Sequence, residues 1–258
     1  MVEQDGRVLR ARVARGRHGT LDGEALPEIV DALATLDPAT TGALLLVSES
    51  FPTHPENFCT GGDVRAFAGA EDRGAYVRSL AESFHAFLRA IVDAPVPVVA
   101  AVPGWAAGAG MSIVCAADLA VGGRSTKLRP AYPGIGFSPD GGMTWTLPRL
   151  VGAGRARHIL LTDRALDAET ALGLGILATV VDDGEVREEA EHTAHRLAHG
   201  PTVALGRIKR LLGASPDRSL PQQLAAEADA ISASAAGPEG AEGLSAFVEK
   251  RPPTFHAG

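Results

Sequence analysis

One carboxylate, Asp140, stands in the stretch GIGFSPDGG (residues 134–142) among glycines, a proline and apolar residues. No basic residue inside the stretch neutralises its charge. Pro-Asp-Gly is common turn chemistry, because proline presets φ, aspartate bonds nearby N–H groups and glycine accepts positive φ. A carboxylate is also a group that can carry a proton to or from carbon as a general acid or base. On its own, the stretch leaves both interpretations of Asp140 open.

Two glycine loops, FCTGGD at 58–63 and AAGAG at 106–110, each precede a predicted helix. Small residues let a ligand approach the backbone, and the N–H groups at a helix start have no partner inside the helix. If the two loops converge, they can stabilise one oxyanion with two donors. The alternative is that the small residues only let helices pack tightly against a sheet.

Several other chemistries are disfavoured by spacing. Ser112 in AGMSIV lacks the glycine frame of a nucleophile elbow, and GWAAGAGM matches neither GxGxxG nor a P-loop. The eight histidines show no metal-ligand spacing. Cys59 and Cys115 are too far apart for a CxxC pair or a cysteine-based zinc site, so we expect two reduced thiols.

Composition sets the broad class. The chain has 258 residues, 45% hydrophobic and 21% charged, which is typical of a globular protein with a sizeable core. The net charge is −7 and the Lys and Arg residues are scattered, so we expect no nucleic acid and no anionic membrane as a partner. The first residues form no apolar export signal and no run of 18 apolar residues occurs, so we expect a cytoplasmic protein.

Hydrophobic periodicity predicts the elements that must position these residues. In the first part, alternation at RVLRARVAR and short apolar runs at 43–47, 98–102 and 119–123 predict strands, separated by helices at 22–36, 73–93 and 106–118. Beyond Gly152 the pattern predicts helices, apart from a short strand at ATVV, over 152–161, 167–173, 185–199, 201–212, 219–233 and 238–249. The pattern therefore predicts an α/β core followed by a helical C-terminal third.

Three stretches, ENFCTGGDVRAF, VPVVAAVPGWAAGAGMSIVCAADLAVGG and AYPGIGFSPDGGMTWTLPRLVG, resemble in order and spacing three signatures of the crotonase family, which includes enoyl-CoA hydratases and isomerases. DRALDAETALGLGILATVV, GRIKRLL and FVEKRPPTF extend the resemblance over nearly the whole chain. It implies an α/β spiral of β-β-α turns over residues 1–195 and a helical trimerisation region over 196–258. It also implies a homotrimer or homohexamer.

The resemblance further implies acyl-CoA thioester substrates, with CoA as part of the substrate, no separate cofactor and no metal. The family stabilises an enolate with two backbone N–H groups, which by position are those of Gly62 and Ala109. The adenine and pantetheine would lie along residues 57–62. Hydratases of the family carry two glutamates where this chain has Ser112 and Tyr132, and neither replaces a carboxylate easily, so simple hydration is disfavoured.

Asp140 stands where double-bond isomerases of the family carry an Asp or Glu, and its segment is most similar to the ring-processing isomerases of phenylacetyl-CoA degradation. The resemblance thus predicts isomerisation of a 3-enoyl-CoA, or of a ring-derived CoA thioester, to the 2-enoyl-CoA with Asp140 as acid and base. A catalytically silent acyl-CoA-binding protein, and a crotonase-type hydratase, hydrolase or decarboxylase, remain alternatives. Asp63 is interpreted as a helix cap. The predicted substrate-binding residues are Phe58, Thr60, Phe67, Trp105, Tyr132, Phe137 and Trp145.

Overall fold

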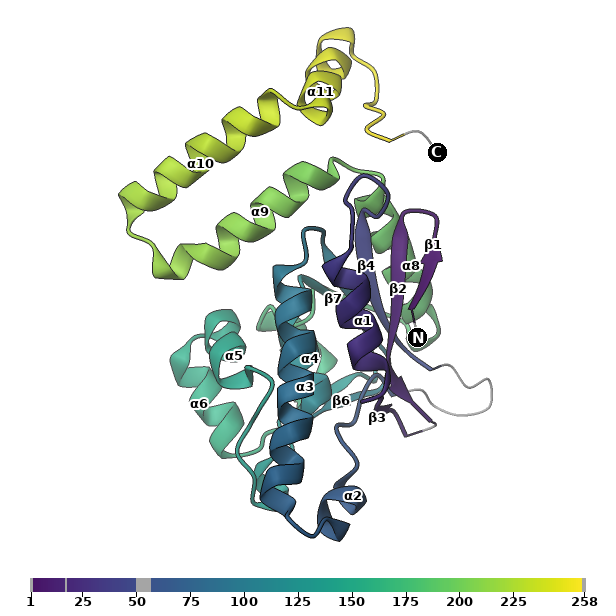
Figure 1. The fold of residues 1–258 in the computed structure, drawn as a ribbon, viewed down its shortest axis with the longest axis vertical. Helices are drawn as coiled ribbons and strands as arrows, with labels where there is room; N and C mark the ends of the chain where they lie inside the picture. The colour runs from purple at the N-terminus through teal and green to yellow at the C-terminus, as the bar shows by residue number, and fades with distance from the viewer. Residues whose placement is uncertain (1, 17, 50–56, 257–258) are drawn as a thin grey trace.

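The computed structural model describes residues 2–16, 18–49 and 57–256. These residues form two sheets, the helices that cover the sheets, and a helical arm at the C-terminus (Figure 1). In the described residues the larger sheet has the strand order β1-β2-β4-β5-β7-β10, with β3 paired to β2. From β2 to β10 the neighbours in this order are parallel, whereas β1 and β3 pair with β2 antiparallel. Its strands are β1 (Val2–Asp5), β2 (Val8–Arg15), β3 (Thr20–Leu21), β4 (Ala43–Ser48), β5 (Val98–Val102), β7 (Leu119–Gly123) and β10 (Thr179–Val181).

A smaller sheet contains β6 (Trp105–Ala107), β8 (Lys127–Arg129) and β9 (Leu166–Asp167). Each of β5 and β7 in the larger sheet is followed closely by a strand of the smaller one, and β6 leads directly into α4 (Ala109–Ala116). The repeat of strand, strand and helix winds the chain as a spiral between two layers. This confirms the predicted α/β fold of β-β-α turns.

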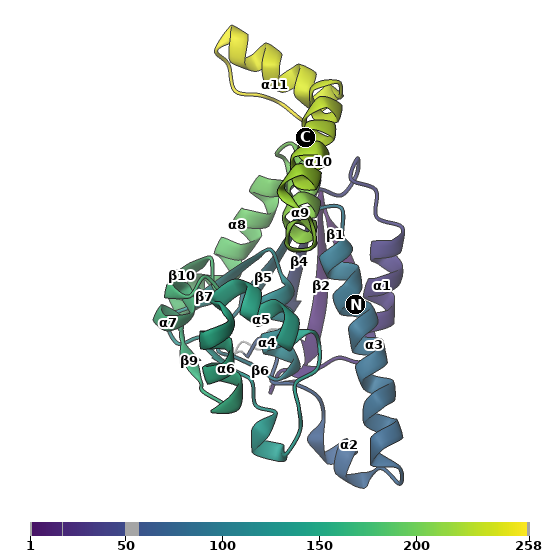
Figure 2. The same cartoon turned by 90° about the vertical axis from the view of Figure 1, so that its left-hand side faces the viewer.

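The larger sheet is buried on both faces. On β4, Leu44 and Leu46 belong to the core beneath the helices α1 (Ala25–Ala34), α3 (Arg73–Asp93) and α4, and Leu45 belongs to a second cluster on the opposite face. That second cluster includes Ala190 of α8 (Val186–Ala198), and Figure 2 shows α8 on one side of the sheet and α1 and α3 on the other. A continuous apolar run such as ALLLV fits a parallel strand covered on both sides.

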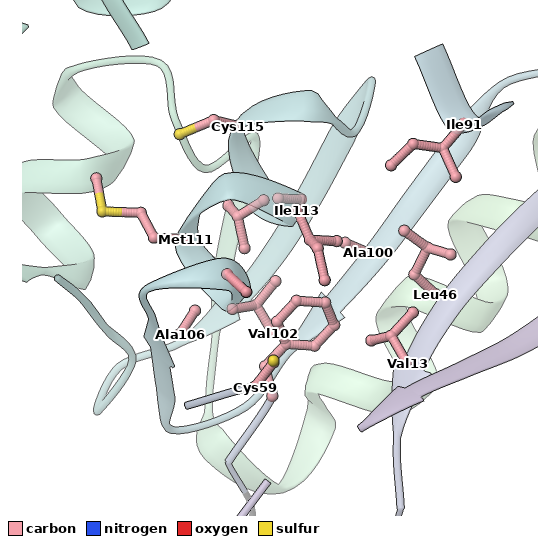
Figure 3. Packing of buried hydrophobic residues seen from close by; sticks show 14 of the residues in the cluster. Val13, Leu46, Cys59, Ile91, Ala100, Val102, Ala106, Met111, Ile113 and Cys115 are labelled. Atoms are coloured by element: carbon pink, nitrogen blue, oxygen red, sulfur yellow. The ribbon is translucent and has the colours of Figure 1, made fainter. Parts of the chain in front are cut away.

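Small residues bring the glycine-rich helix α4 into the centre of the larger cluster. Figure 3 shows Met111 and Ile113 of α4 packed near Val102 and Ala106. A Cβ atom at Gly110 would lie 1.9 Å from the carbonyl oxygen of Cys59, so the helix start touches the preceding glycine loop through a position that only glycine can occupy.

The remaining helices of the spiral are short. They are α2 (Val64–Gly69), α5 (Met143–Val151), α6 (Ala153–Leu161) and α7 (Ala168–Gly173), with 3₁₀ turns at Pro133–Ile135, Asp183–Glu185 and Ser215–Asp217. None of the helices in the described residues is long and apolar enough to cross a bilayer.

The C-terminal arm consists of α9 (Thr202–Ala214), α10 (Leu220–Ala235) and α11 (Pro238–Glu249), and α10 and α11 extend away from the sheets (Figures 1 and 2). Lys209 on α9 ties the arm to the spiral, because its Nζ lies 2.7 Å from Asp118 Oδ2 and donates to the Ile91 carbonyl at 2.8 Å. Burial lowers the pKa of Lys209, and the Asp118 carboxylate opposes that effect. The preceding helix α8 runs on to Ala198, across the expected boundary at residue 195.

The long elements match the sequence prediction closely, and several short ones were missed. The helices at 73–93 and 238–249 and the strands at 98–102 and 119–123 have the predicted bounds. The missed elements are β1, β3, β6, β8, β9 and α5, whereas the helix expected after Asp63 is present as α2. Strands of two or three residues carry no periodicity, and α5 holds Pro148 in its interior, which ordinarily argues against a helix.

Candidate active site

A cavity of about 870 Å³ opens between the glycine loops, α3 and the segment 131–140. Its walls combine the backbone of small residues with apolar and aromatic side chains, as expected of a small-molecule site. The lining residues used below are Arg15, Glu24, Thr60, Gly62, Asp63, Phe67, Arg73, Tyr76, Ala109, Tyr132, Phe137 and Asp140.

The two glycine loops converge at this cavity. The N–H of Cys59 donates to the Trp105 carbonyl at 3.2 Å, and the N–H of Ala107 donates to the Cys59 carbonyl at 2.8 Å. A Cβ atom at Gly61 would lie 3.9 Å from the backbone nitrogen of Ala109. The loops are therefore joined like two short parallel strands, and their ends face the same space.

The backbone N–H groups of Gly62 and Ala109 are both available at the cavity. Within the described residues, neither group donates a hydrogen bond to a protein acceptor. Ala109 opens α4, where N–H groups have no intrahelical partner, and Gly108 before it has φ 55° and ψ −121°, a conformation suited to glycine. Two unpaired donors thus line one apolar cavity.

Asp140 also lines the cavity, and its carboxylate is held by a tyrosine. Tyr132 Oη donates to Asp140 Oδ1 at 2.6 Å, and Oδ2 accepts no hydrogen bond from the described residues. Burial raises the pKa of Tyr132, and the negative charge of Asp140 raises it further, so the phenol stays protonated and remains a donor. One carboxylate oxygen is therefore anchored while the other is free to meet a ligand.

The main chain at Asp140 is held by two further side chains. Ser112 is fully buried, and its Oγ lies 3.2 Å from the Asp140 carbonyl oxygen, 3.4 Å from the Gly108 carbonyl oxygen and 3.4 Å from Tyr132 Oη. On the other side, the N–H of Gly141 donates to His85 Nε2 at 3.2 Å. Sequence reasoning missed His85, because the contact joins residues 56 positions apart.

Two other carboxylates line the cavity, and both are engaged. Asp63 caps α2 by accepting from the N–H groups of Arg65 and Ala66, as predicted from the sequence. Glu24 Oε2 lies 2.9 Å from Arg15 Nη1, and the Glu24 side chain is largely in solvent. Asp140 is thus the carboxylate whose surroundings differ from an ordinary cap or surface ion pair.

Aromatic side chains form part of the cavity wall. The Phe67 ring stacks near Phe137 at a centroid distance of 6.4 Å and meets Tyr76 edge-on at 6.3 Å. The backbone at Gly62 depends on this packing, because a Cβ atom there would lie 2.7 Å from Phe67 Cζ. The wall beside the donor Gly62 is therefore flat and apolar.

The structure brings some of the predicted substrate-binding residues together and leaves others outside. Thr60, Phe67, Tyr132 and Phe137 line the cavity with Gly62, Ala109 and Asp140. Phe58 does not, since its side chain is 0% exposed within the hydrophobic core. Apolar side chains next to a glycine loop serve the core as readily as a ligand, and the spacing does not separate the two.

The two tryptophans also lie outside the cavity lining. Trp105 faces Lys127, whose Nζ is 5.9 Å from the ring centroid, and Trp145 faces Arg149 at 3.7 Å. Both rings are partly exposed and paired with a cation from the protein surface. Each tryptophan ring therefore contacts a basic side chain, and neither ring lines the cavity.

The remaining candidates for chemistry are metal-binding side chains and the two cysteines. No group of three or more His, Cys, Asp or Glu side chains there is arranged to hold a metal ion. Both cysteines are buried free thiols, and burial raises the pKa of Cys59 and of Cys115 to about 12. Such thiols remain protonated at neutral pH and are poor nucleophiles.

The family model described as Enoyl-CoA hydratase/isomerase matches residues 5–258. The chain belongs to this family. A solved structure of an enoyl-CoA hydratase from Polaromonas sp. JS666 superposes with a TM-score of 0.90 at 29% identity, covering 98% of each chain. The crotonase fold and the family resemblance drawn from the three motifs are thereby confirmed.

Two curated proteins resemble the chain in sequence. A probable enoyl-CoA hydratase of Rhodobacter capsulatus is 37% identical over 198 residues, 77% of this chain and 76% of the relative. The 1,2-epoxyphenylacetyl-CoA isomerase of Escherichia coli is 36% identical over 203 residues, with the same coverage of 77% and 76%. The family chemistry is therefore that of acyl-CoA hydratases and isomerases.

Proposed function

We propose that this protein isomerises a 3-enoyl-CoA, or a ring-derived CoA thioester, to the 2-enoyl-CoA. The observation that carries the proposal is the free Oδ2 of Asp140 in the same cavity as the unpaired N–H groups of Gly62 and Ala109. A double-bond shift requires one carboxylate that removes and returns a proton, and an oxyanion hole that stabilises the intermediate.

The reaction moves one proton. Asp140 takes the proton from C2 of the 3-enoyl thioester, and the electron pair of the broken C–H bond delocalises onto the thioester oxygen. The N–H groups of Gly62 and Ala109 stabilise the resulting dienolate oxygen. The protonated Asp140 then returns the proton to C4, which forms the C2–C3 double bond and restores the carboxylate.

Tyr132 and Ser112 argue against simple hydration. Addition of water needs a base for the water and an acid for the α-carbon. Tyr132 is committed as a donor to Asp140, and Ser112 is fully buried against backbone carbonyl groups and the phenol. Neither is a second carboxylate, so Asp140 alone must manage the protons.

The walls of the cavity support a substrate with a flat acyl group. Phe67, Tyr76 and Phe137 present aromatic faces or edges beside the donor Gly62, which suits an unsaturated chain or a ring. Arg15 and Arg73 line the same cavity and offer cations to an anionic carrier such as the phosphates of CoA. The similarity to the Escherichia coli isomerase supports a ring-derived substrate.

Incubation of the wild-type protein with 3-hexenoyl-CoA in deuterated water tests the proposal. We expect conversion to the 2-enoyl thioester, with deuterium entering at C2 or C4 of the recovered thioesters. Release of free CoA would indicate a hydrolase, and formation of the 3-hydroxyacyl thioester a hydratase. A separate incubation with a carboxylated thioester would reveal a decarboxylase by loss of carbon dioxide. The absence of any exchange or product with both 3-hexenoyl-CoA and a ring-derived CoA thioester would indicate a silent binding protein.

A further inference from the structure

His85 lies on α3 beside the candidate site, and the chemistry proposed above does not use it. Its side chain is partly buried and is not part of the cavity lining, so it does not face the space that the substrate would occupy. Its Nε2 instead accepts the N–H of Gly141, the residue that directly follows Asp140, at 3.2 Å. His85 therefore contacts the main chain that carries the carboxylate.

The turn at Asp140 and Gly141 is pressed against two helices. Gly141 is buried with φ +60°, and a Cβ atom there would lie 2.4 Å from Phe84 Cε1 and 2.9 Å from Ser112 Cβ. The position therefore requires glycine, both for its conformation and for its space. Because glycine has no side chain that could anchor it, the orientation of the Gly141 peptide depends on backbone hydrogen bonds.

The peptide unit between Asp140 and Gly141 is bonded at both ends. Its carbonyl oxygen accepts from Ser112 Oγ at 3.2 Å and from the Met143 N–H at 3.3 Å, and its N–H donates to His85. A buried N–H without an acceptor is unfavourable, and water has little access at this position. Removal of the His85 acceptor therefore favours a rotation of this peptide, which turns the Asp140 side chain with it.

We propose that His85 is a positioning residue, whose neutral imidazole holds the peptide after Asp140 so that the free carboxylate oxygen faces the substrate. Nε2 must lack a proton to accept, so the ring carries its hydrogen on Nδ1. Three helical or loop positions then fix the acid–base group: Tyr132 holds its carboxylate, Ser112 its carbonyl and His85 the following N–H. The kinetic part of this inference rests on the proposed isomerisation.

The test compares His85→Leu, which removes the acceptor, with His85→Gln, whose Oε1 stands as many bonds from Cα as Nε2 does. His85→Phe, which keeps a ring, replaces the leucine variant if that variant does not fold. His192→Leu is the matched control, because His192 is an exposed histidine on α8, across the sheet from the site. All proteins are used as full chains.

Steady-state kinetics with 3-hexenoyl-CoA is the first measurement. We expect His85→Leu to lower kcat by about tenfold to a hundredfold, the scale of a misplaced catalytic group, with KM little changed. His85→Gln should restore most of kcat, and His192→Leu should behave like the wild type. The inference would be overturned if His85→Leu kept the kcat of the wild type, or if kcat were as low in His85→Gln as in His85→Leu.

Amide hydrogen exchange of peptides covering residues 137–147 is the second measurement, and it needs no turnover. The leucine variant should exchange faster in this segment and the glutamine variant should be protected again. If the wild type isomerises neither a 3-enoyl-CoA nor a ring-derived CoA thioester, the proposed function fails, and the exchange result alone decides about His85. Equal exchange in the wild type and His85→Leu would overturn the positioning role whatever the reaction.

Discussion

Phe58 and Phe247 are the same residue type in two regions of the chain that surround it differently. Phe58, beside the first glycine loop, is 0% exposed, whereas Phe247 on α11 is 83% exposed in the single chain. The difference extends beyond these two residues, because the central strands β4 and β5 are wholly buried and the arm exposes further large apolar side chains. These include Leu212, Leu220, Ile231, Leu244 and Val248.

The contrast indicates that the spiral can bury its apolar side chains within one chain, whereas the arm cannot. The spiral buries its own apolar surface and thereby holds the glycine loops and Asp140 in place. The arm is joined to the spiral through α9, where Gly206 lies so close to the Pro95 carbonyl that a Cβ atom would come within 2.0 Å. Its exposed large apolar side chains are numerous, which is typical of a surface that another protein covers. We propose that other copies of the chain cover it, in a trimer or a pair of trimers.

The largest effect on turnover is expected in the spiral. Asp140→Asn keeps the shape of the side chain but cannot accept the migrating proton, so kcat should fall by about 10²–10⁴-fold. Asp229→Asn, an exposed residue of α10, should leave kcat unchanged. The measurement is the initial rate with 3-hexenoyl-CoA, together with binding of hexanoyl-CoA, which should persist. A variant that isomerises at the wild-type rate would make Asp140 a turn residue only.

The largest effect on stability is expected at Phe58. Phe58→Ala leaves a cavity in a closely packed core and should lower the free energy of unfolding by about 3–5 kcal/mol. Phe247→Ala removes a ring that the single chain leaves in solvent, so its loss should be smaller and should depend on protein concentration if another copy covers the ring. Urea unfolding at two protein concentrations checks both. Equal losses that do not change with concentration would contradict the contrast between the regions.

Ala109→Pro probes the second glycine loop. Proline removes one proposed oxyanion donor while suiting the first position of a helix, so turnover should fall by about a hundredfold and acyl-CoA binding should suffer less. Circular dichroism must first show that α4 and its surroundings still fold. A folded variant with normal turnover would exclude Ala109 as a donor to the enolate.

Phe247→Lys tests the arm directly. A charge in the proposed contact between copies should lower the molecular mass in solution, from a trimer or hexamer toward a monomer, with little change in circular dichroism. Static light scattering at micromolar protein measures the mass. A monomeric wild type would contradict the proposed assembly, and the exposed apolar surface of the arm would then need another explanation.

The smallest effect is expected at Ser112. Ser112→Ala removes a hydroxyl that contacts the Asp140 carbonyl, but that carbonyl keeps the Met143 N–H as a donor. Most of the activity should therefore remain, since no base is lost. The rate of 3-hexenoyl-CoA isomerisation checks this result. A loss as large as that of Asp140→Asn would give Ser112 a chemical role.

The sequence alone determined the long elements, the family and the candidate carboxylate. Burial along a strand or helix repeats at a fixed period, so the apolar pattern of 73–93 or 98–102 predicts its element without knowledge of distant contacts. The motifs around Gly62, Ala109 and Asp140 are also local in sequence, and all three residues line one cavity. Local signals were sufficient for these features.

Only the tertiary structure decided which side chains meet. The convergence of the loops at Cys59 and Ala107 and the contact of His85 with Gly141 join residues from different turns of the spiral, and the bond from Tyr132 to Asp140 depends on how one loop folds back on itself. The packing of separate elements also decided that Phe58 lies in the core and not in the cavity wall. Such contacts depend on how separate elements pack in three dimensions, and a residue's type and its neighbours in sequence do not specify that packing.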